Sequence, residues 1–208
     1  MNEELVFYTN PMSRGRIVRW MLEEVGEPYR TEIVAYGPAM KAPDYLALNP
    51  MGKVPMVRRG AAVITEVAAI CAWLADVFPT AGLAPEPGDR AAYYRWLFFC
   101  AGPVEAAVSA KSLGFEPEGP EQERRVGFGS LARVTDTLER AVGVGRYIAG
   151  DRFSAADVYL GSWLGRWLEL GPMERRPAFV DYVARVTDRE AYRRAKTLDD
   201  AAVPPSSG

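Results

Sequence analysis

The chain has 208 residues, of which 49% are hydrophobic and 25% are charged, and its formal net charge is −2. This length suffices for one large or two small domains with cores, and the near-neutral charge argues against a nucleic-acid partner. The chain contains no histidine, which excludes a Ser-His-Asp triad, a histidine general base and a histidine-ligated metal. We therefore expect no metal cofactor.

The N-terminal segment predicts neither a leader nor a membrane anchor. Residues 1–4, Met-Asn-Glu-Glu, are acidic and lead directly into an apolar segment, so we expect no signal peptide. No uncharged apolar run approaches the length of about 18 residues that a membrane span needs. Cys71 and Cys100 lie in apolar helical patterns and are expected to be buried free thiols, which favours a reducing, cytoplasmic location.

The first third of the chain alternates between strand and helix patterns. Ile17 and Met21 share one apolar face of a predicted helix, and Gly26 marks its end. The elements expected before residue 49 are a strand at 5–8, a loop at 9–13, a helix from 14 to the stop at 26, a strand at 31–34 and a short helical connection at 40–48.

Residues 48–74 carry the most informative pattern. Asn49-Pro50-Met51-Gly52 is a turn signal, and Pro55 interrupts the start of a strand, which requires an edge position, a bulge or a cis bond. A hairpin turn at 59–61, a strand at 62–64 and a helix opened by Thr65-Glu66 follow. This order brings the exposed backbone of Val54 close to the free amides of a helix N-terminus, which suits a peptide-like anionic ligand.

This segment resembles the glutathione-binding half of cytosolic glutathione transferases, specifically bacterial theta- or beta-like members of the serine type. The resemblance rests on Asn-Pro-Met-Gly-Lys-Val-Pro and on Glu66, eleven residues after Pro55, at the start of an Ala-Ile-Cys-Ala-Trp-Leu-Ala helix. It implies a cis proline and a glutathione cosubstrate whose cysteinyl part pairs with the backbone of Val54.

The resemblance also implies contacts for the two ends of glutathione. Glu66 and Val67 would hold the γ-glutamyl end, although the family usually has Ser or Thr where this chain has Val67. Lys41 and Lys53 match basic positions that meet the glycyl carboxylate. The alternative for both lysines is an ordinary solvated surface charge.

The remainder of the chain predicts helices only. A Pro/Gly-rich segment at 79–89 separates two regions of different composition. We predict an α/β thioredoxin-like N-terminal domain followed by an all-α C-terminal domain, the glutathione transferase fold. Its predicted parts are the glutathione-binding domain at 1–79, a linker at 80–89, the helical domain at 90–202 and a disordered tail at 203–208. Its helical patterns cover approximately 90–113, 121–142, 154–170 and 177–195.

A second motif lies at residues 147–160, Tyr-Ile-Ala-Gly-Asp-Arg-Phe-Ser-Ala-Ala-Asp-Val-Tyr-Leu. Ser154 is placed to cap a helix, and Asp157 is placed to accept a hydrogen bond from the amide of the cap residue, as in a capping box. The same run resembles the C-terminal domain of glutathione transferases, where it nucleates the core helix. We interpret Asp157 as a folding residue rather than a catalytic one.

Two hydroxyl groups are candidates for activating the glutathione thiol. Only a thiolate is nucleophilic, and a hydroxyl that donates a hydrogen bond to sulfur favours the ionised form. Ser13, just before the first helix, is the leading candidate, and its alternative role is a helix cap. Tyr8, at the end of the first strand, matches the tyrosine-type transferases, and its alternative role is a core or interface residue.

The charges of the first helix are opposite to those its dipole favours. Arg14, Arg16 and Arg19 lie near its N-terminal end, and Glu23 and Glu24 near its C-terminal end. One interpretation is an anion site at the start of the helix. The other is that the arginines pair with acidic groups elsewhere, for example across a subunit interface. The two interpretations are compatible.

The sequence supports three hypotheses for function. The first is a glutathione transferase acting on a small hydrophobic electrophile or a peroxide, as a homodimer. The second is a non-catalytic binding or assembly module on the same fold. The third, a disulfide reductase, is disfavoured because the loop at 9–13 has no cysteine. The electrophile pocket is expected between the domains, with Met12, Phe98, Phe99, Phe115 and Trp163 as candidate lining residues.

Overall fold

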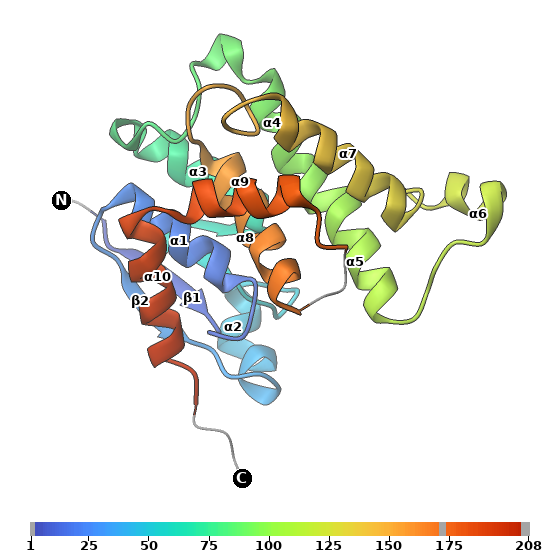
Figure 1. Cartoon of the computed structure of the whole chain (residues 1–208). Helices are drawn as coiled ribbons and strands as arrows, with labels where there is room; N and C mark the ends of the chain where they lie inside the picture. Colours follow the sequence, from blue (N-terminus) through green and yellow to red (C-terminus); the bar gives the residue numbers. More distant parts are fainter. Residues whose placement is uncertain (1–2, 171–173, 205–208) are drawn as a thin grey trace. The chain divides into compact units, whose positions relative to one another are not determined.

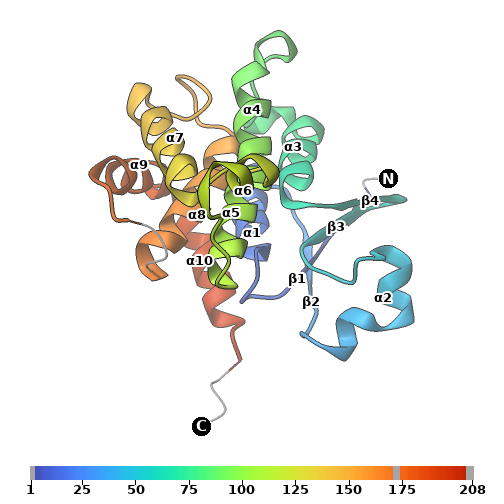
Figure 2. The ribbon, with the colours of Figure 1, turned by 90° about the vertical axis from the view of Figure 1, so that its right-hand side faces the viewer.

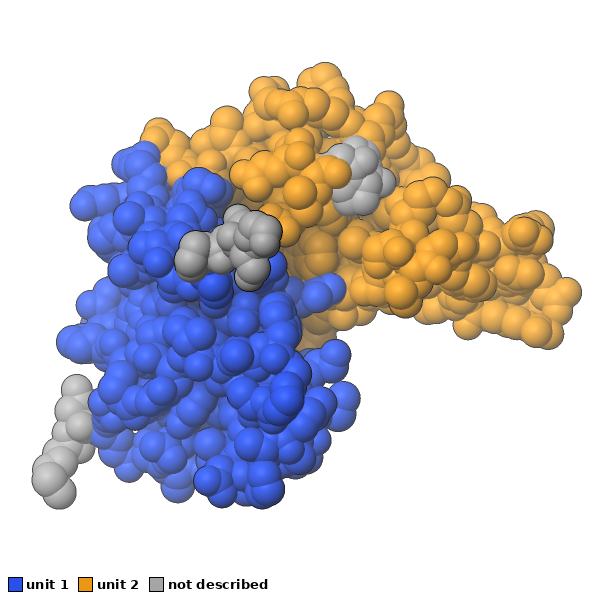
Figure 3. Space-filling view, turned by 90° about the horizontal axis from the view of Figure 1, so that it is seen from below, with its two compact units in different colours: residues 1–81, 189–208 blue, residues 82–188 orange. Residues whose placement is uncertain are grey.

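The computed structural model describes residues 3–170 and 174–204. Contacts divide the chain into two compact units, one comprising residues up to 81 together with those from 189 onward, and one comprising residues 82–188 (Figure 3). Within the described residues, every helix falls short of the length and apolar character that crossing a membrane requires.

The first unit is built on a four-stranded mixed sheet with the order β2-β1-β3-β4. β1 pairs in parallel with β2 and antiparallel with β3, and β3 pairs antiparallel with β4. α1 and α3 cover one face, α2 lies on the other, and α10 packs against α1 (Figures 1 and 2). The bounds are β1 Leu5–Thr9, α1 Gly15–Val25, β2 Arg30–Ile33, a 3-10 turn at Pro38–Lys41, α2 Pro43–Leu48, β3 Met56–Arg59, β4 Ala62–Thr65, α3 Val67–Val77, a 3-10 turn at Pro79–Ala81 and α10 Glu190–Ala201.

Alternation along β1 decides which side chain meets which helix. Phe7 is fully buried on the α1 side, where the Arg19 guanidinium lies 4.9 Å from its ring centre. Tyr8 faces the other side, where its ring lies 6.1 Å from that of Tyr45 in α2. Successive strand residues point to opposite faces, so β1 separates the core beneath α1 from a second apolar cluster beside α2.

The helices and turns of the second unit come without any extended strand among its described residues. Its core is formed where α4, α7, α8 and α9 meet, and it includes the buried side chains Tyr93, Leu138, Leu160 and Phe179. The bounds are a 3-10 turn at Pro87–Asp89, α4 Ala91–Phe99, a π-helical turn at Cys100–Val104, α5 Glu105–Ser112, α6 Gly119–Arg125, α7 Leu131–Val144, α8 Ala155–Leu170 and α9 Pro177–Thr187.

The observed helices are shorter than the sequence patterns in three places. The pattern at 90–113 contains a π turn that includes Pro103, which cannot donate to the helical ladder. The pattern at 121–142 divides into α6 and α7 across a segment in which Gly129 has φ +70°. The pattern at 177–195 divides at Asp188, and Arg189 adopts an extended conformation before α10.

The contacts of α10 group it with the sheet-containing unit rather than with the other helices. The sequence-based division follows chain order and assigns 90–202 to one domain, so the two descriptions differ at this helix. The segment predicted as a linker, 80–89, includes part of one short 3-10 turn, Pro79–Ala81, and all of another, Pro87–Asp89. Of the predicted tail at 203–208, residues 205–208 lie outside the described residues.

Asp157 has the structural role that the sequence indicates. Its fully buried carboxylate accepts hydrogen bonds from the amides of Ile148 and Ser154 and from the hydroxyls of Ser154 and Tyr182, at 2.8–3.0 Å. Burial raises the pKa of Asp157, and the four donors oppose that rise. The residue therefore joins the start of α8 to α9 and to the preceding loop.

Candidate functional site

Strand register brings the three parts of the candidate site to one end of the sheet. Tyr8 of β1 lies opposite Met56 of β3, and Met56 lies opposite Thr65 of β4. The loop that follows β1, the Val54-Pro55 pair that precedes β3 and the Glu66-Val67 pair that follows β4 therefore continue from neighbouring positions. Residues far apart in sequence meet here because β3 runs antiparallel to both β1 and β4.

The Val54-Pro55 peptide bond is cis, as the resemblance implied. The carbonyl of Lys53 accepts hydrogen bonds from the Tyr45 hydroxyl at 2.6 Å and from the Asn49 side-chain amide at 2.8 Å, which fixes the peptide before Val54. Val54 is half-buried, and its N–H and C=O have no hydrogen-bond partner among the described residues. This backbone is thus held in place and available to pair with an extended peptide.

The turn before the cis proline is braced from within. Its amide at Gly52 donates to the Asn49 carbonyl at 2.8 Å, and Gly52 has φ +57°. The Lys41 ammonium donates to the carbonyls of Met51 and Gly52 at 3.1 and 3.2 Å. The Lys53 side chain is exposed and has no partner among the described residues. Lys53 is therefore the freer of the two candidates for a ligand carboxylate.

Glu66 has the one positive φ of a non-glycine residue in the described chain, +65°. Such a backbone costs about 1–3 kcal/mol and persists where the surroundings enforce it, often at binding sites. Glu66 precedes the first turn of α3, but its side chain makes no capping hydrogen bond and is exposed. The carboxylate and the first amides of α3, beginning with Val67, are therefore presented together at the helix start.

The loop after β1 is shaped by Asn10, which lies within the loop predicted at 9–13. Its side-chain amide donates to the Val34 carbonyl at 3.1 Å, and its side-chain oxygen accepts from the Met12 amide at 3.0 Å. At Gly15 a Cβ would lie 1.9 Å from the Thr9 Oγ1, so the start of α1 approaches β1 as only glycine allows. The Asn-Pro pair marks this turn in the sequence, but the sequence does not reveal its long-range partner.

The Ser13 hydroxyl is half-buried and already engaged on both sides. It donates to the Asn10 carbonyl at 2.7 Å and accepts from the Gly15 amide at 2.9 Å. Its hydrogen bond to the Gly15 amide resembles a cap, although α1 begins at Gly15 and Arg14 occupies the cap position. To stabilise a thiolate, the hydroxyl proton would have to turn from the Asn10 carbonyl to the sulfur, because a hydroxyl has one proton to donate.

Tyr8 occupies a different environment from Ser13. It packs against a buried cluster of Val34, Met40, Tyr45 and Met56, beside Val54. Its hydroxyl has no hydrogen-bond partner among the described residues. Both candidate hydroxyls thus lie near the end of β1, one in the loop and one on the face that carries Val54.

Four charged residues of α1 pair with α10 or with Arg189, the residue just before it. Arg16 contacts Asp200 at 2.7 Å and Arg19 contacts Asp199 at 3.2 Å, while Glu23 accepts from Arg194 and Glu24 from Arg189. Later residues of α1 pair with earlier residues near α10, so the two helices lie antiparallel. This supports the interpretation in which the arginines of α1 have acidic partners, and it places the partners of Arg16 and Arg19 on the C-terminal helix.

The candidate electrophile residues are distributed over both units. Met12 belongs to the first unit and is 64% exposed, and the other four belong to the second. Phe98 and Phe115 are exposed, Phe99 is half-buried, and Trp163 is buried with its indole N–H donating to Glu105 at 3.0 Å.

The two thiols of the protein lie among its buried apolar residues. Cys71 and Cys100 are both free and fully buried. Desolvation raises the pKa of Cys71 to about 12, which keeps the thiol protonated and unreactive. Within residues 3–170 and 174–204, no three or more Cys, Asp or Glu side chains are grouped as metal ligands would be.

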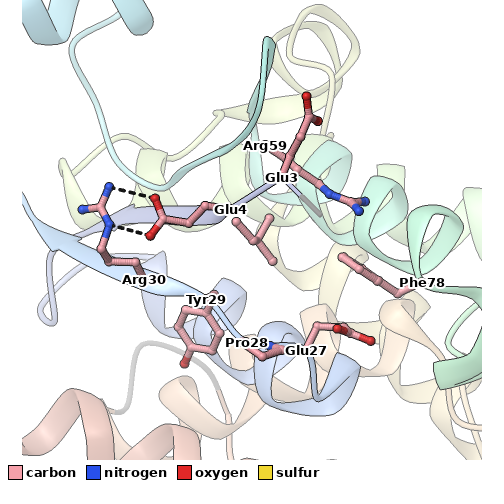
Figure 4. A pocket seen from close by; sticks show the side chains of 9 residues that line it. Glu3, Glu4, Glu27, Pro28, Tyr29, Arg30, Arg59 and Phe78 are labelled. Carbon is pink, nitrogen blue, oxygen red and sulfur yellow. Dashed lines mark hydrogen bonds and ion pairs between the residues drawn. The ribbon is translucent and has the colours of Figure 1, made fainter. Parts of the chain in front are cut away.

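A cavity of about 350 Å³ lies at the opposite end of β1 from Ser13 (Figure 4). Arg30 pairs with Glu4 at its rim, and the Arg59 guanidinium stacks 5.1 Å from the ring centre of Phe78. The lining residues are Glu3, Glu4, Leu5, Glu27, Pro28, Tyr29, Arg30, Arg59 and Phe78. This cavity contains none of the residues that the sequence pattern selects.

Comparison with known proteins agrees with the geometry. Residues 12–77 match the protein family described as "Glutathione S-transferase, N-terminal domain". Residues 120–195 match the family described as "Glutathione S-transferase, C-terminal domain". Glutathione S-transferase GstA of Escherichia coli O157:H7 is 30% identical over 149 residues, which cover 68% of this chain and 72% of that protein. A Stringent starvation protein A homolog of Pasteurella multocida is 27% identical over 181 residues, 86% of this chain and 82% of that protein.

A solved structure extends the likeness to three dimensions. The theta class glutathione S-transferase of Xanthomonas axonopodis pv. citri, with glutathione bound, is 30% identical and has a TM-score of 0.73, covering 93% of this chain and 97% of that chain. Together with the matched sheet, the cis proline and the helical second unit, these findings show that the chain belongs to the glutathione S-transferase family.

Proposed function

We propose that this protein is a glutathione transferase that activates glutathione as a thiolate for attack on a small hydrophobic electrophile. The observation that carries the proposal is the juxtaposition, at one end of the sheet, of the unpaired backbone of Val54 with the strained Glu66 at the start of α3. A fixed, unpaired peptide group binds an extended ligand as a further strand would.

Glutathione has the chemistry that this arrangement matches. Its cysteinyl N–H and C=O would pair with Val54, and its γ-glutamyl ammonium and carboxylate would meet the Glu66 carboxylate and the Val67 amide. The glycyl carboxylate would reach Lys53, with Lys41 bracing the turn behind it. Val67 provides only a backbone donor at a position where the family usually adds a hydroxyl.

Ser13 is our proposed donor to the glutathione sulfur, with Tyr8 as the alternative. The thiol proton leaves to solvent, the thiolate sulfur bonds to the electrophilic carbon, and the leaving group departs with its electron pair. The same thiolate would reduce a hydroperoxide when a second glutathione completes the disulfide, releasing alcohol and water. Met12, Phe98, Phe99, Phe115 and Trp163 remain the proposed residues for the apolar substrate.

A second candidate function is a non-catalytic binding or assembly module. Two observations favour it: the Ser13 proton is already donated to Asn10, and one relative is named as a Stringent starvation protein A homolog rather than a transferase. Such a module would bind glutathione or a peptide at Val54 without transferring it.

Calorimetric titration of glutathione, followed by turnover of a chlorodinitrobenzene and of cumene hydroperoxide, tests the proposal. Glu66→Gln should weaken binding about tenfold to a hundredfold, because a charged hydrogen bond contributes about 1.5–3 kcal/mol. Glu27→Gln, which alters an exposed carboxylate at the opposite end of the sheet, should leave binding unchanged. Binding without turnover of either substrate would favour the module.

Two further features are proposed from family membership. We propose that the protein acts as a homodimer, in keeping with the prevalence of two-fold assemblies, and that it works in the cytoplasm. Sedimentation equilibrium would show a mass of twice the monomer if the first proposal is right, and a monomer would contradict it.

A further inference from the structure

The C-terminal helix is connected by hydrogen bonds to the loop that carries Ser13. The Arg16 guanidinium donates from Nε to the Pro11 carbonyl at 2.5 Å and from Nη1 to Asp200 at 2.7 Å. Pro11 lies within the loop, and Asp200 lies near the end of α10. One side chain therefore joins the Ser13 loop to a helix from the far end of the chain.

The other hydrogen bonds of this loop to described residues are local or lie at its start. The Asn10 side chain donates to the Val34 carbonyl, which anchors the start of the loop. The Met12 amide and the Ser13 hydroxyl both donate to Asn10. The hydrogen bond from Arg16 holds the Pro11 carbonyl, which lies between Asn10 and Met12. A guanidinium is suited to this role because its planar nitrogens donate in fixed, divergent directions. Moving the Arg16 head would move the Pro11 carbonyl and, with it, the Ser13 hydroxyl.

Asp200 contacts the Arg16 guanidinium on the side of α10. Its carboxylate accepts from Arg16, and this hydrogen bond is the main reason that the pKa of Asp200 is lowered. Lys196, one turn earlier in α10, adds a second cation 3.6 Å away. The neighbouring Arg19–Asp199 pair holds the two helices in register beneath this contact. Asp200 lies beyond the residues matched by the two family descriptions.

We propose that Arg16 is a positioning residue for the Ser13 loop and that Asp200 of the C-terminal helix fixes Arg16 in that role. The inference rests on the proposed function and adds α10 to the parts of the chain that set thiol activation. Small misplacements of a catalytic hydroxyl affect the reaction more than they affect ligand binding, so the effect should appear in the thiolate rather than in glutathione affinity.

The interface supplies a matched control. Arg194 also joins a carboxylate and a backbone carbonyl across α1 and α10, since it donates to the Glu23 carboxylate at 3.0 Å and to the Glu23 carbonyl at 3.2 Å. It lies at the other end of α1 from the loop. Arg16→Gln and Arg194→Gln thus remove equivalent contacts from one interface, and only the first touches the Ser13 loop.

The experiment measures the pKa of enzyme-bound glutathione from its thiolate absorbance as a function of pH, together with kcat and KM for a chlorodinitrobenzene. In Arg16→Gln the thiol pKa should rise by about one unit, which lowers the thiolate fraction about tenfold below that pKa. KM for glutathione should change less than about threefold, since the Val54 and Glu66 contacts remain. Arg194→Gln should match the wild type.

Two more variants separate positioning from charge. Arg16→Lys keeps the charge but has one nitrogen for two divergent acceptors, so it should behave like Arg16→Gln. Asp200→Asn retains Arg16 but weakens its anchor and should give a smaller rise in the thiol pKa. A wild-type thiol pKa in Arg16→Lys would overturn the inference, and so would equal effects of Arg16→Gln and Arg194→Gln. Neither result would affect the proposed function. Absence of a thiolate signal in the wild type would overturn the proposed function as well.

Discussion

The Arg19 guanidinium donates to the Asp199 carboxylate at 3.2 Å in a pair whose side chains are only 5% and 1% exposed. Arg19 also donates to the Tyr29 hydroxyl and to Thr31 of β2, and it lies over the Phe7 ring of β1. Asp199 is less fully hydrogen-bonded than Arg19, because its second oxygen has no hydrogen-bond partner among the described residues. This pair fastens α10 to α1 within the sheet-containing unit.

Replacing Arg19 by methionine should destabilise the protein by about 3–5 kcal/mol, because the substitution leaves the Asp199 carboxylate buried without its cation. Chemical denaturation monitored by tryptophan fluorescence measures the change in the free energy of unfolding. Arg194→Met removes the cation of a pair on the same two helices whose arginine side chain is 47% exposed, and it should cost less than about 1 kcal/mol.

The double variant Arg19→Met with Asp199→Leu provides the complementary test. Replacing both buried charges by apolar groups should recover most of the stability lost in the single variant. If the double variant were as unstable as Arg19→Met, the loss would come from the shape of the arginine rather than from the unpaired carboxylate.

The backbone conformation of Glu66 is expected to lower the stability of the protein, while its side chain contributes to glutathione binding. At φ +65°, glycine carries no Cβ penalty, whereas alanine keeps the strain. Glu66→Gly should therefore be about 1 kcal/mol more stable than Glu66→Ala, while both lose glutathione affinity to the same extent. Thermal unfolding and calorimetric titration measure the two effects, and equal stability of the two variants would show that the backbone is not strained.

Asp157 should affect folding and leave the glutathione site unchanged. Asp157→Asn presents an NH₂ group where the carboxylate accepted from the Ser154 amide and hydroxyl, so buried donors lose their acceptor. We expect a loss of about 2–4 kcal/mol in the free energy of unfolding, with glutathione affinity unchanged in the folded protein. A variant of normal stability that loses turnover would instead make Asp157 a catalytic residue.

The Arg16–Asp200 pair predicts a specific pH dependence. Because Arg16 lowers the pKa of Asp200 in the folded protein, the stabilisation is complete above the ordinary carboxyl pKa of about 3.9. It is lost as the pH falls through the lowered value. Both side chains are partly exposed, so solvent screening makes the contribution small.

Unfolding measured from neutral to acidic pH should show the wild type more stable than Asp200→Asn at neutral pH. The difference in the free energy of unfolding between the two proteins should disappear on acidification and become smaller in high salt. A gap that widens as the pH falls would contradict the assigned pairing.

The fold could be predicted largely because local signals agree with one another. Gly26 ends α1 with φ +76°, and its amide donates to the Leu22 carbonyl, as the stop signal indicated. Pro55 required an unusual backbone, and the cis bond satisfies that need. The apolar face of α1 follows from its side-chain pattern.

The partners of α1 could not be predicted, since they lie at the other end of the chain. The reversed charges of Arg16 and Arg19 allowed either an anion site or acidic partners elsewhere, and Asp199 and Asp200 became visible only in the packing of α10. The role of Asn10 was missed for the same reason, because its anchor is the carbonyl of Val34 in another segment.

The most direct test of the account is the thiolate absorbance of glutathione bound to the wild type, Ser13→Ala and Tyr8→Phe proteins, with affinity measured in parallel by calorimetry. We predict that all three proteins bind glutathione and that the thiolate signal at neutral pH is lost in Ser13→Ala but retained in Tyr8→Phe. Loss in Tyr8→Phe alone would assign activation to the tyrosine. Failure of the wild type to bind millimolar glutathione would contradict the account and leave the fold as a scaffold for another function.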